Sequence, residues 1–144
     1  MDSANSRHAP HHAPQPTLPL PKSRIPAAQD VEALLLALGV PARLSGFRYL
    51  TDTILYLLYQ PVETRCLAIE VYPVIAKKYS TTPFAVEHAI RAALRKAWTE
   101  ASIPAYCALS GRPMRANEIR PTTCEFLANV QLYLRIHLAE LGGE

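Results

Sequence analysis

From position 27 onward, apolar residues recur at spacings of three and four residues, which is the pattern of an amphipathic helix. The first such group consists of Val31, Leu34, Leu35 and Leu38. Gly39 and Pro41 follow this group and favour the end of a helix. The sequence shows no internal repeat and no stretch with the convincing alternation of a half-buried strand. It therefore predicts an all-α bundle of about six helices.

The same spacing predicts the helices that follow. A second helix runs from residue 47 or 49 to Tyr59, and its buried face consists of Leu50, Ile54, Leu57 and Leu58. A third spans Thr64–Tyr79, and its inward residues are Leu67, Val71, Val74 and Ile75. Pro73 either starts a helix there or kinks this one. Later helices are expected at 83–101, near 106–109, and from a capping box formed by Thr122 and Glu125 to Gly142.

Residues 1–26 differ in composition from the rest of the chain. They hold six of the thirteen prolines and three of the five histidines, namely His8, His11 and His12. Such a segment buries too little apolar surface to offset its chain entropy, so we expect a disordered or polyproline-like tail at 1–26 and one domain at 27–144. The three histidines could bind a transition metal, but a solvated tail is the simpler interpretation.

Composition excludes several classes of protein. Hydrophobic residues make up 49% and charged residues 19%, which argues against a disordered chain as a whole. Cys66, Cys107 and Cys124 form no CxxC pair, so we expect reduced, mostly buried thiols and no zinc site. The chain shows no secretory signal and no apolar run long enough to span a bilayer, which favours the cytoplasm. We find no nucleophile motif or phosphate loop, and so predict a protein that is not an enzyme and needs no cofactor or metal.

The pattern typical of a helix-turn-helix occupies residues 71–101. Ala76 is a small residue suited to the contact between the two helices, and Val86 and Ile90 can face back from the second helix. Thr82 can cap that second helix, with Pro83 in its first turn. Many helical hairpins in ordinary bundles share this pattern, so it does not establish DNA binding by itself.

Charge adds to the pattern. The net charge is +3, which is compatible with an anionic partner without being diagnostic of one. The cations near the two helices are Lys77, Lys78, Arg91, Arg95 and Lys96, and they are partly offset by Glu70, Glu87 and Glu100. Such cations are suited to phosphate oxygens, although a solvated charged face has the same composition.

Several motifs in the same order carry a more specific resemblance. They are Gly39–Ala42, Gly46–Leu50, Tyr72–Thr82, Val86-Glu87, Ala89–Arg91, Ala97-Trp98, Arg120–Thr122 and Glu125-Phe126. Together they resemble the C-terminal effector domain of stage-zero sporulation protein A, the response regulator of endospore formation. The resemblance covers residues 31–141 and implies an all-helical domain that docks a recognition helix in the major groove of promoter DNA. It also implies a dimer or tandem pair on double-stranded DNA.

The resemblance assigns roles to individual residues. It implies a base contact for Glu87 and phosphate contacts for Lys77, Lys78, Thr82, Arg95 and Arg120. Arg91 could reach guanine or the DNA backbone. His88 could contact a base edge or a phosphate, or be an exposed helix residue without a ligand. The family has arginines at the positions of Ala85 and His88, and small residues at those of Pro83 and Phe84. Because alanine and histidine cannot form arginine's bidentate bonds to guanine, we predict a changed or relaxed target sequence, with non-specific affinity for phosphates largely kept.

The resemblance also leaves one alternative function open. We expect a stand-alone regulator that has no receiver domain and is not controlled by phosphorylation in the way of the family. The alternative is a protein-interaction module that has lost its DNA affinity and modulates a full-length relative.

Overall fold

The computed structural model describes residues 18–22, 25–60 and 66–142. These residues form helices and no strands, so the predicted all-α class is confirmed. The α-helices are α2 (Ala28–Ala37), α3 (Ser45–Tyr59), α4 (Tyr72–Lys78), α5 (Pro83–Ala97), α6 (Ile103–Ser110) and α7 (Thr123–Gly142). A π-helical turn, η2 (Leu67–Val71), precedes α4, and a 3₁₀ turn, η3 (Glu100–Ser102), precedes α6. No helix in this part of the chain is both long and apolar enough to cross a membrane.

Helix ends follow the signals in the sequence at several places. Gly39 has a φ of +87° directly after α2, which ends that helix as predicted. The capping box of α7 is present, since the amide of Thr122 donates to Glu125 Oε1 at 2.9 Å and the amide of Glu125 donates to Thr122 Oγ1 at 3.1 Å. The end of α2 and the start of α7 are thus both fixed by residues that are close to them in the sequence.

The predicted third helix is not one continuous α-helix. The described part consists of η2 followed by α4, and Pro73 lies in the first turn of α4. The prediction that Val74 faces inward is wrong, because its side chain is 45% exposed. A π-helical turn contains more residues than an α-helical turn, so it rotates the residues that follow it. Residues 64 and 65, where this helix was expected to begin, lie outside the described residues.

α5, the second helix of the predicted helix-turn-helix, ends earlier than predicted, at Ala97 rather than Ala101. Trp98 adopts an extended backbone, and Thr99 caps the 3₁₀ turn that follows. Trp98 Nε1 donates to the carbonyl of Ala116 at 3.1 Å, and its ring packs edge-on against Tyr106. Trp98 is therefore a half-buried structural residue, and this packing pulls the chain out of the helix. The next helix, α6, extends beyond the predicted 106–109 at both ends.

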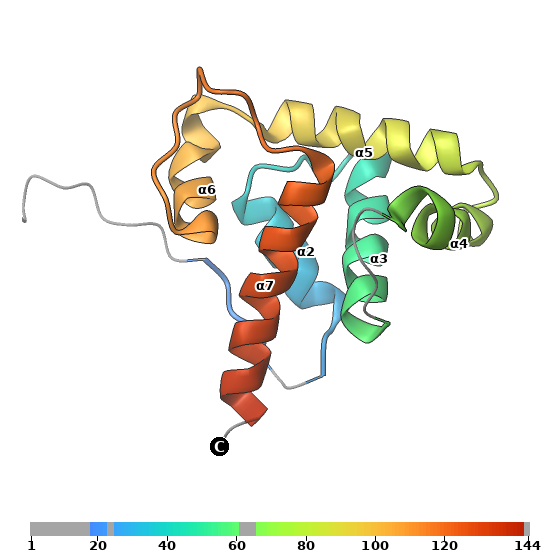
Figure 1. The fold of residues 1–144 in the computed structure, drawn as a ribbon, viewed down its shortest axis with the longest axis horizontal. Coiled ribbons are helices and arrows are strands. Elements are labelled where there is room, and N and C mark those ends of the chain that lie inside the picture. Colours follow the sequence, from blue (N-terminus) through green and yellow to red (C-terminus); the bar gives the residue numbers. More distant parts are fainter. Residues whose placement is uncertain (1–17, 23–24, 61–65, 143–144) are drawn as a thin grey trace, which may run out of the picture.

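The helices pack around one core, with α5 across the end of α3 and α7 along the bundle (Figure 1). The largest fully buried side chains are Leu34, Leu35, Leu38, Leu50, Ile54, Leu57, Ile90, Phe126, Leu127 and Leu134. Arg135 on α7 also donates to the carbonyl of Leu57 at 2.7 Å, which links α7 to α3. α4 lies beside one end of α5 (Figure 1).

Part of the predicted N-terminal tail contacts this bundle. Leu18 is buried, and the hydroxyl of Tyr133 donates to the carbonyl of Pro19 at 3.1 Å. The hydroxyl of Tyr59 donates to the carbonyl of Pro26 at 2.7 Å. The contacts of the domain thus reach beyond residue 27 toward the N-terminus, while the tail boundary at residue 26 stays a prediction. The three histidines considered for a metal lie outside the described residues.

Cys66, Cys107 and Cys124 form no disulfide within the described residues, and their expected burial is incomplete. All three have intermediate exposure. The Sγ of Cys107 accepts from the amide of Met114 at 3.2 Å, so this thiol helps to fix the turn after α6. Cys107 and Cys124 nevertheless pack partly against the hydrophobic core.

Candidate nucleic-acid interface

A tight turn at residues 79–82 connects α4 to α5. Ser80 has a φ of +55°, and the amide of Thr81 donates to the carbonyl of Ala76 at 2.9 Å, which closes the end of α4. Thr82 Oγ1 accepts from the amide of Ala85 at 3.1 Å, and Pro83 occupies the first turn of α5. The cap and the proline position were both predicted, and they fix where α5 begins.

Close contact with α3 holds α5 in place. Val86 and Ile90 are fully buried, as predicted, and Ala76 of α4 is buried as well. The packing role of Gly46, at the start of α3, was not predicted from the sequence. A Cβ atom at Gly46 would lie 2.3 Å from the carbonyl oxygen of Ala89 on α5. The absence of a side chain at this glycine therefore sets how closely α3 and α5 approach.

The opposite side of α5 is open to solvent. Phe84, His88, Arg91 and Arg95 are all exposed. Because they are separated by four, three and four residues, they form one stripe along the helix. We call these four residues the α5 stripe. It places an aromatic pair at the N-terminal end of α5 and two cations toward the C-terminal end.

Two contacts order the side chains on this side of α5. The rings of Phe84 and His88 stack with their centroids 6.0 Å apart and their planes 19° apart. Glu87 Oε2 and Arg91 Nη1 form an ion pair at 3.5 Å, one helical turn apart. Both groups of this pair are solvent-accessible, so the pair is weak and can exchange for contacts with a ligand.

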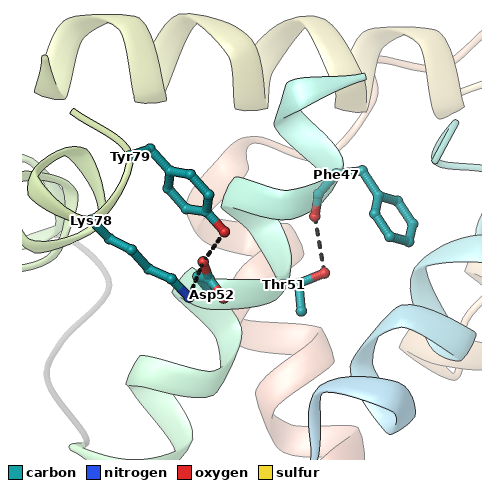
Figure 2. Close-up of polar contacts among 5 residues, drawn as sticks. All are labelled: Phe47, Thr51, Asp52, Lys78 and Tyr79. Atoms are coloured by element: carbon teal, nitrogen blue, oxygen red, sulfur yellow. Dashed lines mark hydrogen bonds and ion pairs between the residues drawn. The ribbon is translucent and has the colours of Figure 1, made fainter. Parts of the chain in front are cut away.

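Lys78 and Tyr79 at the end of α4 converge on Asp52 of α3 (Figure 2). Lys78 Nζ lies 3.0 Å from Asp52 Oδ2, and the hydroxyl of Tyr79 donates to the same oxygen. The hydrogen bond to Asp52 raises the pKa of Lys78, and burial together with Asp52 raises the pKa of Tyr79. Arg48 lies over the Tyr79 ring, 5.3 Å from its centroid. This cluster anchors the turn and neutralises one of the two predicted lysines.

Arg120 reaches the same region from the segment between α6 and α7. With Glu87 and Arg91 it lines a groove of about 430 Å³, which also includes Thr122 and Thr123 at the start of α7. Burial raises the pKa of the Tyr72 phenol well above its usual range, and the Glu87 carboxylate adds to the effect. The fold thus brings a cation from the C-terminal third of the chain next to α5.

The structure places the predicted residues on one continuous region. Seven of them lie on α4, the turn and α5: Lys77, Lys78, Thr82, Glu87, His88, Arg91 and Arg95. Arg120 joins them through the groove. Neither the role of Asp52 nor the exposure of Phe84 was predicted from the sequence. Asp52 lies 27 residues from Tyr79, so no local spacing could show their contact. In contrast, the exposure of Phe84 could have been predicted, because the spacing of the buried residues of α5 puts Phe84 on the opposite side of the helix.

An all-helical domain in which two helices, α4 and α5, are joined by a tight turn and α5 exposes cations fits the helix-turn-helix class. The family model for the sporulation initiation factor Spo0A C terminal matches residues 31–134, and the chain belongs to this family. Membership implies the DNA-binding effector domain of a sporulation regulator. The family is one of regulators of transcription rather than enzymes.

Proposed function

We propose that this chain is a sequence-specific transcriptional regulator that inserts α5 into the major groove of promoter DNA and reads a target of its own. The observation that carries the proposal is the α5 stripe, which is open to solvent while the other side of α5 is fixed against α3 and α4. A rigid helix of this kind can present side chains to base edges. Location in the cytoplasm, where such a regulator would meet DNA, belongs to the same proposal.

Contacts divide between bases and phosphates along this region. Glu87 can accept from a cytosine amino group, and Arg91 can donate to guanine once their mutual ion pair opens. His88 can contact a base edge. Phosphate oxygens are suited to the remaining predicted residues, which are Lys77, Lys78, Thr82, Arg95 and Arg120. Of these, Lys78 must first separate from Asp52.

Altered specificity follows from two positions on α5. Ala85 is half-buried and has no polar side chain, and His88 can form at most one hydrogen bond to a base at a time. A bidentate arginine–guanine contact is worth about 1–3 kcal/mol of discrimination. The resemblance implies such contacts at both positions, so their loss supports a target that differs from the family element.

In vitro selection from a random duplex library tests the proposal. We expect one enriched motif, and retardation of that motif in a gel should weaken steeply as salt increases, because each phosphate contact contributes about −0.9 to the log–log slope. R95A should make this slope about 0.9 less negative. K96A is the matched control, because Lys96 is an exposed neighbour that lies outside the α5 stripe. The absence of any retardation at micromolar protein in low salt would contradict DNA binding.

That negative result would favour a second function, a protein-interaction module that modulates a full-length relative. The exposed apolar side chains of Ile69 on η2 and Val74 on α4 favour it, since DNA phosphates offer them no partner. We also propose that two copies bind DNA as a dimer or tandem pair. Leu132 and Ile136, which are exposed one turn apart on α7, are suited to a contact between copies.

A further inference from the structure

The first turn of α5 exposes a large apolar side chain. Phe84 is 74% exposed, directly after the cap and the proline that start the helix. Its ring stacks on His88. Exposure of this side chain to water has a cost, because a phenylalanine side chain is strongly stabilised by removal from water. The position therefore suggests an apolar partner.

The surroundings of Phe84 indicate what that partner is. Arg91 and Arg95 continue the α5 stripe, and Arg95 lies about 16 Å from Phe84 along the helix axis at 1.5 Å per residue. The major groove is about 12 Å wide. The distance between the two side chains exceeds this width, so Phe84 and Arg95 would contact different parts of a duplex, and an arginine is suited to phosphate oxygens. The α5 stripe is thus apolar at its N-terminal end and cationic at its C-terminal end. It complements a DNA duplex that presents an apolar group among its bases and phosphates along its backbone.

Among the four bases, thymine alone presents an apolar group in the major groove, its 5-methyl group. We infer that Phe84, stacked on His88, is a specificity-determining residue that packs against a thymine methyl group of the target. The inference rests on the proposed DNA-binding function and deepens it by naming one base. It predicts a target with a fixed thymine opposite the N-terminal end of α5. In this part of the helix, Ala85 and His88 replace the arginines that the family has for reading guanine.

The test replaces thymine by uracil in the selected duplex, one position at a time. Uracil pairs with adenine as thymine does and differs from thymine only in the absence of the 5-methyl group. Wild-type protein should bind the uracil duplex about fourfold more weakly at one position, which is the fold-change expected for one buried methyl group. F84A should bind the thymine and uracil duplexes equally at that position, and F84L should retain part of the difference.

I69A is the matched control, because Ile69 is also an exposed apolar residue, at 81%, but lies on η2. It should keep the full fourfold difference. Equal binding of thymine and uracil duplexes by wild-type protein at every position would overturn the inference while DNA binding stands. No retardation of any duplex would refute DNA binding and the inference together. Retention of the full fourfold difference by F84A would also overturn it, because another residue would then contact the methyl group.

Discussion

Two neighbouring lysines at the end of α4 have different electrostatic partners. Lys78 forms an ion pair with Asp52, whereas no described carboxylate pairs with Lys77. We expect K77A to make the log–log salt slope of DNA binding about 0.9 less negative, which corresponds to one phosphate contact. K78A should change the slope by less, because Asp52 already neutralises that charge. Gel retardation across a salt series measures both slopes.

The variant D52N separates this explanation from a simple difference in position. It removes the negative charge and keeps the size of the side chain, so it should release Lys78 to bind phosphate. We expect tighter non-specific binding and a slope up to about 0.9 more negative than that of wild-type protein. In a D52N background, K78A should then have the effect that K77A has in wild-type protein. Equal slopes for K77A and K78A in wild-type protein would refute the assigned pairing.

Among the helices, the approach of α3 to α5 depends on a single glycine. G46A would place a methyl carbon 2.7 Å from the Cβ of Ala93 and closer still to the backbone of Ala89. The helices must move apart, so we expect the free energy of unfolding to fall by about 1–3 kcal/mol. DNA affinity should fall as well, because α5 carries the proposed base contacts. Urea denaturation and gel retardation measure the two effects.

Gly111 provides a control for the effect of adding a methyl group to glycine. It follows α6 with a φ of +75°, and no atom lies within 4 Å of a Cβ built there. G111A should therefore lower stability by about 1–2 kcal/mol through backbone strain and leave DNA affinity unchanged. If G46A retained wild-type affinity for DNA, the proposed link between the α3–α5 contact and the reading helix would be wrong.

The parts of these elements that the sequence predicted depend on local interactions. The cap at Thr82 and the capping box of Thr122 and Glu125 each involve residues three positions apart. The end of α5 was not predicted, because it depends on packing of Trp98 and on a hydrogen bond from Ser102 Oγ to the carbonyl of Ala97. These contacts replace the next helical turn.

The candidate site divides in the same way. Residues on α4 and α5 could be predicted as one group because a helix fixes their relative positions. The pairing of Lys78 with Asp52, and the groove that Arg120 shares with Arg91, need the folded chain. A list of cations from the sequence therefore overestimates how many are available to DNA.

At the scale of the whole molecule, the same packing that fixes the helices also protects tyrosine hydroxyls. Burial raises the pKa of four of them, Tyr72, Tyr79, Tyr106 and Tyr133, above the ordinary 10.0. The folded chain therefore keeps phenol protons that the unfolded chain releases. Because the pKa values are raised in the folded chain, the tyrosines' contribution to stability is complete below pH 10 and is lost as the pH rises above it. Lys78 acts in the same direction, since its pKa is raised above 10.5 in the folded chain.

We therefore expect alkaline pH to unfold this domain. Each tyrosine that ionises in the unfolded chain alone should lower the free energy of unfolding by about 1.4 kcal/mol per pH unit above pH 10. Urea denaturation between pH 8 and pH 11 measures the slope. Y106F is a suitable comparison, because Tyr106 is nearly fully buried and burial is the sole cause of its raised pKa. Y106F should make the fall in the free energy of unfolding with pH less steep by about 1.4 kcal/mol per pH unit, which corresponds to one proton. An unchanged slope would show that the Tyr106 phenol ionises in the folded domain.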